Sequence, residues 1–132
     1  MKIKSSKELV DEANKAIKSM KPDEVKEAFL KGDITLIDIR DIRELWNEGT
    51  VENSIHIPRG MLEFWLDPQS AYYKEKKIGN IKKLVLFCAI GFRSALATKA
   101  LTDMGFDNAY NVEGGFDGLK NSGLKIIPKT KK

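Results

Sequence analysis

The sequence predicts an α/β fold in which helices cover both faces of a mostly parallel sheet. Short apolar runs typical of strands alternate along the chain with segments of helical periodicity. The run over residues 84–87 is apolar at every position, as expected of a strand covered on both faces. Parallel strands joined by helices place those helices on both faces of one sheet.

The composition indicates a soluble globular domain. A length of 132 residues fits one domain, and 42% hydrophobic and 32% charged residues are ordinary values. No stretch approaches the roughly 20 apolar residues of a membrane span. Residues 1–10 are charged and lack the apolar region of a secretory signal, so we expect a cytoplasmic protein and no membrane partner.

Several classes of ligand are not expected. The net charge of +4 comes with lysines gathered at both ends, which we interpret as solvated, residues 129–132 being a basic tail. No basic stripe with interleaved aromatic residues accompanies them, so we do not expect nucleic acid as a partner. One histidine and one cysteine are too few for a structural zinc site, and we expect neither metal nor cofactor. A single cysteine also excludes an internal disulfide.

The N-terminal half begins with helical signals. Ser5 and Glu8 form a capping-box pattern, and apolar residues recur with helical spacing up to Met20. We therefore expect residues 1–20 to be a helical extension and residues 21–128 to be the main domain. A second helix is predicted from Pro22 to Gly32, a strand over 35–39 and a helix over 42–48.

The C-terminal half continues the alternation. A strand is predicted over 54–57, one or two helical turns over 59–65, and a polar irregular segment over 67–83. The strand over 84–87 precedes the clearest helix, over 93–104, and a strand follows over 108–112. The Gly114–Gly115 pair differs from GxGxxG and predicts a turn that opens a last helix, which ends by Gly123.

Chemistry-bearing residues follow the predicted strands. Asp38 and Arg40, Arg59 and Cys88 each stand at the carboxyl end of a strand, where ligands bind in open α/β sheets. A cysteine reacts as its thiolate. The short loop to Arg93 predicts inward backbone amides, a helix N-terminus and a fixed cation, which all favour an anion. Gly91 suits so short a turn.

Two other interpretations of Cys88 stay open at this point. A lone cysteine after an apolar strand is often a core residue. A Cys–His protease would need an imidazole within hydrogen-bond reach of the thiol. His56 is the one candidate, and it stands between two isoleucines of a predicted strand, so we expect it to pack.

Four motifs give the chain a family resemblance over roughly residues 20 to 125. These are the D-x-R of Asp38 and Arg40, the I-x-I-P turn at 55–58, the C-x4-R loop at 88–93 and the E-G-G turn at 113–115. In this order and spacing they resemble a single-domain rhodanese, a sulfurtransferase. The stretch over 61–73 is longer than in the smallest members.

The resemblance implies a three-layer α/β/α sandwich around about five parallel strands. Cys88 would be the nucleophile: it would take a sulfane sulfur from a donor such as thiosulfate and pass it, as a persulfide, to cyanide or a thiol. No general base is required. The substrate-binding residues would be those of the loop, namely Ala89, Ile90, Gly91, Phe92, Arg93 and Ser94.

Roles outside the loop are assigned by position. Arg40 is expected to pair with a carboxylate such as Glu44 and, with Asp38, to fix the sheet edge. Arg59 heads a short helix and is a candidate to bind an anionic donor. The aromatic residues of the 64–73 segment, and Phe92, fit either a pocket wall or the core.

Two rival functions remain. The uncharged side chains of Ala89, Ile90 and Phe92 offer nothing to attract a small dianion, which favours a persulfide relay to a partner protein. Phosphatases that share the fold resemble C-x5-R in this loop, one residue longer than the four found here. An inactive interaction domain would usually lack the cysteine.

Overall fold

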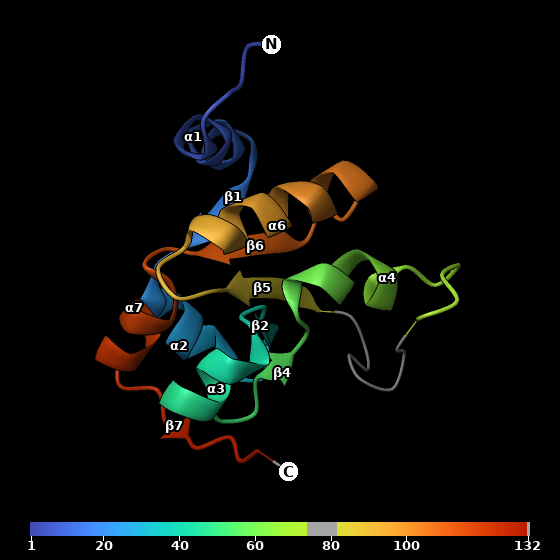
Figure 1. The fold of residues 1–132 in the computed structure, drawn as a ribbon. Coiled ribbons are helices and arrows are strands. Elements are labelled where there is room, and N and C mark those ends of the chain that lie inside the picture. The colour runs from blue at the N-terminus through green and yellow to red at the C-terminus, as the bar shows by residue number, and fades with distance from the viewer. Residues whose placement is uncertain (74–81, 132) are drawn as a thin grey trace.

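The computed structural model describes residues 1–73 and 82–131 and confirms the α/β sandwich (Figure 1). Its main sheet has five strands in the order β1-β6-β5-β2-β4, and every neighbouring pair is parallel. The strands are β1 (Lys18–Met20), β2 (Ile34–Asp38), β4 (Ile55–His56), β5 (Lys83–Phe87) and β6 (Ala109–Val112).

Helices form the two outer layers, as Figure 1 shows. One face carries α6 (Phe92–Met104) and α4 (Leu62–Leu66), which follows the 3-10 turn η1 (Arg59–Met61). The other face carries α2 (Pro22–Leu30), α3 (Ile42–Glu48) and α7 (Gly115–Asn121). Helix α1 (Ser6–Ala16) lies outside α6, with Val10 and Ala13 packed against Ala95. None of the described helices is long and apolar enough to span a bilayer.

Strand β5 separates the two halves of the core. Leu84, Leu86 and Cys88 pack in the cluster under α6, whereas Val85 and Phe87 pack in the cluster against α2 and α7. Because side chains alternate along a strand, the residue that follows Phe87 must face α6. The strand thereby directs the thiol beneath the first turn of that helix.

The N-terminal prediction is wrong over residues 18–20. The helix ends at Ala16, and Ser19 and Met20 pair in parallel with Asn111 and Val112 as an edge strand. Helical spacing of Ile17 and Met20 favoured a longer helix, but hydrogen bonding to β6 outweighs that weak local preference.

A second, two-stranded antiparallel sheet was absent from the prediction. It joins β3 (Thr50–Val51) to β7 (Ile126–Ile127). Strands of two residues carry no periodicity that a sequence pattern could detect. The predicted irregular segment over 67–83 lies partly outside the described residues.

Candidate active site

The loop between β5 and α6 forms the site. Strand β5 ends at Phe87, and α6 begins at Phe92 with Gly91 as its N-cap at φ +107°. A φ in this region favours glycine, because a Cβ would be strained there. Gly91 therefore lets the chain turn from strand to helix within a few residues, as the sequence predicted.

The thiol of Cys88 accepts backbone hydrogen bonds. The amides of Gly91 and Ser94 lie 3.2 Å and 3.4 Å from Sγ, and the Ser94 hydroxyl lies 3.3 Å from it. Cys88 is 1% exposed, so these groups rather than water surround the sulfur. Hydrogen bonds to a charged acceptor are stronger than neutral ones, so these donors are suited to hold a sulfur that carries negative charge.

The carbonyls of the loop are held on its outer side. The Phe116 amide donates to the Cys88 carbonyl at 2.8 Å, and the Asp117 amide donates to the Ala89 carbonyl at 3.4 Å. The Gly91 carbonyl accepts from the Ala95 amide at 3.1 Å and from Asn111 Nδ2 at 3.4 Å. Helix α7 and strand β6 thus support the loop from outside.

These contacts determine where the loop amides point. In a trans peptide the N–H and C=O are antiparallel, so a carbonyl held outward turns the next N–H inward. The described residues contain no cis peptide. Between Cys88 and Ser94, the structure shows no hydrogen-bond acceptor for the amides of Ala89, Ile90, Phe92 and Arg93. We call these four groups the free loop amides; they can bind an anion beside Sγ.

Gly115 makes the close approach of α7 possible. A Cβ at this position would lie 2.6 Å from the Cys88 carbonyl oxygen and 2.7 Å from that of Ala89, and its φ is +55°. No side chain fits such a gap. The second glycine of the E-G-G turn is therefore needed because the cysteine loop packs directly against it.

Arg93 binds Glu44 across the loop. Its Nη1 and Nη2 donate to the two carboxylate oxygens at 2.7 Å and 3.0 Å. This hydrogen bond is the main cause of the raised pKa of Arg93 and of the lowered pKa of Glu44. The charge of Cys88 contributes less to the raised pKa of Arg93, so the guanidinium lies within electrostatic reach of the sulfur.

Arg40 pairs with carboxylates as predicted, but Glu44, the partner named from the sequence, is wrong. Arg40 is fully buried, and its Nε and Nη2 donate to Asp38 at 3.0 Å and 2.7 Å, while Nη1 reaches Glu48 at 3.3 Å. Asp41 caps α3, so Arg40 precedes the helix and helical i,i+4 spacing does not apply to it. Its guanidinium instead stacks on the Phe116 ring, 4.0 Å from the centroid.

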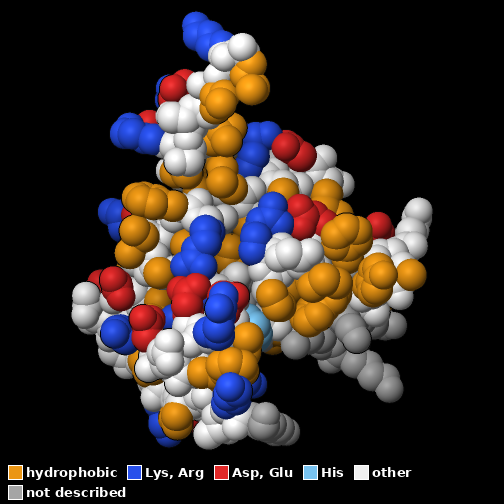
Figure 2. All heavy atoms as spheres, in the orientation of Figure 1, with side chains coloured by type: hydrophobic (Ala, Val, Ile, Leu, Met, Phe, Trp, Pro, Cys, Tyr) orange, Lys and Arg blue, Asp and Glu red, His pale blue; other side chains and the backbone are white. Residues whose placement is uncertain are grey.

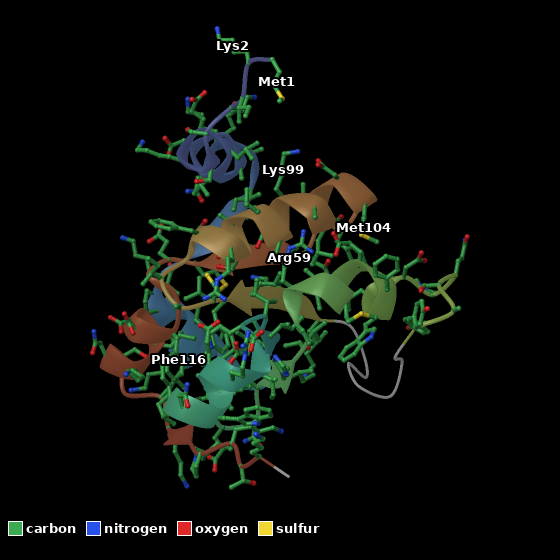
Figure 3. All side chains as sticks on the ribbon, viewed as in Figure 1. Met1, Lys2, Arg59, Lys99, Met104 and Phe116 are labelled. Atoms are coloured by element: carbon green, nitrogen blue, oxygen red, sulfur yellow. The ribbon has the colours of Figure 1, made fainter. Side chains whose placement is uncertain are left out.

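The remaining candidates lie apart from the sulfur contacts. Arg59 stands beside the start of α4, on the other side of the sheet from Phe116 (Figure 3), and pairs with Glu63 at 2.7 Å. His56 Nε2 lies 2.7 Å from the Arg40 carbonyl oxygen.

The aromatic candidates divide between core and surface. Trp65 packs against the core cluster under α6, whereas Phe64 is 50% exposed and Phe92 60% exposed. Figure 2 shows acidic and basic side chains side by side at the centre of one molecular face, with groups of hydrophobic side chains beside them.

Sequence reasoning missed Asn111 altogether. Its one signal is a polar residue inside a predicted strand, between Tyr110 and Val112. The support that Gly115 and α7 give to the loop was missed too, because the glycine pair indicated only a turn.

Comparison with known proteins assigns most of the chain to one family. The model of the rhodanese-like domain matches residues 21–122. The solved structures with similar folds include the following two. A Rhodopseudomonas palustris protein of unknown function, named a possible tyrosine phosphatase, has 39% identity over 96% of this chain and 97% of its own, with a TM-score of 0.88. The polysulfide-sulfur transferase homodimer of Wolinella succinogenes has 34% identity over 92% and 85%, with a TM-score of 0.71.

Curated relatives include longer proteins. The mouse thiosulfate sulfurtransferase/rhodanese-like domain-containing protein 3 is 32% identical over 70% of this chain and 62% of its own length. A tRNA uridine(34) hydroxylase of Hamiltonella defensa is 34% identical over 83% of this chain. The chain spans less than two thirds of both proteins, 62% and 30% respectively. With the sheet order, the cysteine loop and the family match in agreement, the chain belongs to the rhodanese-like domain family.

Proposed function

We propose that the protein is a sulfurtransferase that moves a sulfane sulfur through a persulfide on Cys88. The observation that carries the proposal is the set of four free loop amides beside a thiol that already accepts two backbone hydrogen bonds. An outer persulfide sulfur is anionic, and a ring of amides is suited to it. Relatives named as transferases of sulfur support the same chemistry.

The reaction needs no general base. The Cys88 thiolate attacks the outer sulfur of thiosulfate, an Sγ–S bond forms, and the S–S bond breaks so that sulfite leaves with the electron pair. The anionic persulfide is then attacked at its outer sulfur by cyanide or a thiolate acceptor. The Sγ–S bond breaks, the Cys88 thiolate returns, and thiocyanate or a new persulfide leaves.

Release of thiocyanate from thiosulfate and cyanide tests the proposal. We expect turnover by the unaltered protein and none by Cys88→Ser, whose hydroxyl keeps the fold without a transferable sulfur. Polysulfide offered in place of thiosulfate distinguishes the donors. Equal turnover by the serine variant contradicts the proposal.

An apolar surface favours a relay to a partner protein as the second candidate. Ile90 is 52% exposed and Phe92 60%, at the loop itself. Phe92 also lines a groove of about 480 Å³ between α1 and α6, together with Val10 and Leu96 among others. Persulfide formation with donors but slow release to cyanide and small thiols distinguishes a relay from a small-molecule enzyme.

A phosphatase is favoured by the name of the Rhodopseudomonas protein alone. Each Nη of Arg93 donates to Glu44, so a carboxylate already offsets the positive charge that a phosphate would need. The loop has four residues between Cys88 and Arg93, which makes a small ring. These two features support sulfur over phosphate as the group held there.

A further inference from the structure

We infer that Asn111 is a positioning residue of the cysteine loop, an inference that rests on the proposed function. Asn111 is 4% exposed and lies on β6, in register with Leu86 of β5. Its Nδ2 donates to the Gly91 carbonyl at 3.4 Å. It is the one side chain outside the loop and α6 that binds a loop carbonyl, within the part of the chain the structure describes.

The side chain is poorly suited to a purely structural role. Neighbours on its face of the sheet, such as Leu86 and Ala109, belong to the apolar cluster under α6. Among the described residues, Asn111 Oδ1 is the single buried side-chain nitrogen or oxygen without a hydrogen-bond partner. A buried acceptor left unpaired destabilises a fold. Packing alone would therefore favour an apolar side chain at this position.

The contact of Nδ2 has a consequence inside the loop. It acts on the peptide between Gly91 and Phe92, whose carbonyl faces β6 and whose N–H must therefore point the opposite way. That N–H is one of the free loop amides. Gly91 also contributes its own N–H to the site, since that N–H donates to Sγ at 3.2 Å.

Asn111 thereby orients the Phe92 N–H directly, so that it faces the position of the outer sulfur. It also restrains Gly91, whose own N–H donates to Sγ, at the carbonyl end of that residue. The Ala95 amide also binds the Gly91 carbonyl, at 3.1 Å, so the helix survives without Asn111 while the peptide loses one of its two restraints.

The test compares Asn111→Leu and Asn111→Val with the unaltered protein. The two variants remove the donor and the unpaired acceptor together, and valine suits a strand should leucine fail to pack. Thr102→Val is the matched control, because it removes a side-chain hydrogen bond to a carbonyl of α6 far from the loop. The readouts are thiocyanate formation, alkylation of Cys88 by iodoacetamide at pH 7, and the melting temperature.

We expect kcat/KM and the alkylation rate of both Asn111 variants to fall about three- to tenfold, the worth of one hydrogen bond. Their melting temperatures should equal or exceed that of the unaltered protein. Unchanged rates, or rates that fall only together with the melting temperature, overturn the inference. If the unaltered protein forms no thiocyanate and gains no sulfur on Cys88, the proposed function fails, while slower alkylation in the variants still supports the role of Asn111.

Discussion

Arg40 and Arg93 both pair with carboxylates, but the first pair is buried and the second is partly exposed to solvent. The pair of Arg40 and Asp38 is 0% exposed on both sides, whereas Arg93 and Glu44 are 44% and 29% exposed. Breaking a buried pair leaves an uncompensated charge inside the protein, and breaking an exposed pair does not. We therefore predict a structural role for Arg40 and a role in the cysteine loop for Arg93.

Substituting each arginine tests that division. Arg40→Met should lower the free energy of unfolding by about 3–5 kcal/mol, because Asp38 is left unpaired. Arg93→Ala should lower it by about 1 kcal/mol or less, and should slow sulfur transfer more than it destabilises the fold. Urea unfolding and initial rates measure both quantities. Equal destabilisation by the two variants contradicts the division.

The ion pair of Glu44 and Arg93 gives stability a dependence on pH. The hydrogen bond with Arg93 lowers the pKa of Glu44 from its ordinary value of 4.5. A carboxyl whose pKa is lowered on folding stabilises the native state fully above the unfolded value, and loses that contribution as the pH falls through the folded value.

Glu44→Gln should therefore be less stable than the unaltered protein at pH 7, by about 1 kcal/mol or less for a partly exposed pair. The difference in stability should shrink as the pH falls below 4.5, because Glu44 then becomes protonated and its ion pair with Arg93 no longer stabilises the native state. Thermal unfolding at a series of pH values measures it. A difference that grows toward acid pH contradicts this assignment.

At the scale of elements, the loop is held by α7 as much as by α6. Gly115→Ala places a Cβ 2.6 Å from the Cys88 carbonyl oxygen, at a φ of +55°. We expect a loss of stability of about 1–3 kcal/mol from backbone strain, together with slower sulfur transfer. Gly60→Ala is the control, since nothing lies within 4 Å of its Cβ position. If the two variants have the same melting temperature and the same rate of sulfur transfer, α7 does not support the cysteine loop as described.

Loop length should decide which group the loop can hold. Four residues separate Cys88 from Arg93, a ring suited to one sulfur atom, whereas phosphate presents three equatorial oxygens. The unaltered protein should not hydrolyse an aryl phosphate, and one glycine inserted after Gly91 should weaken sulfur transfer. Turnover of the phosphate ester that disappears in Cys88→Ser contradicts the argument from size.

The elements around the site could be predicted because each has a strong local pattern. The apolar run of β5, the glycine turn and the stripe of α6 indicate a strand, a loop and a helix without reference to the rest of the chain. Strand β1 and the β3–β7 pair could not be predicted in this way. Their two or three residues are ordered by pairing with distant segments.

For the whole molecule, the order of the strands is what assembles the site. Strand β5 lies between β6 and β2, which brings Asn111 and the start of α7 to the loop from one side and the Asp38–Arg40 turn from the other. A sequence pattern places residues on elements but does not give the neighbours of a side chain. That is why the cysteine loop could be predicted while the partners of Arg40, Arg93 and Asn111 could not.

The location of the transferred sulfur is the central claim, and mass spectrometry tests it most directly. After incubation with thiosulfate or polysulfide, the protein should gain one sulfur atom, and peptide mapping should locate it on Cys88. Cyanide should remove it, and Cys88→Ser should gain none. A protein that gains no sulfur from either donor, or a serine variant that transfers sulfur at the original rate, contradicts the account.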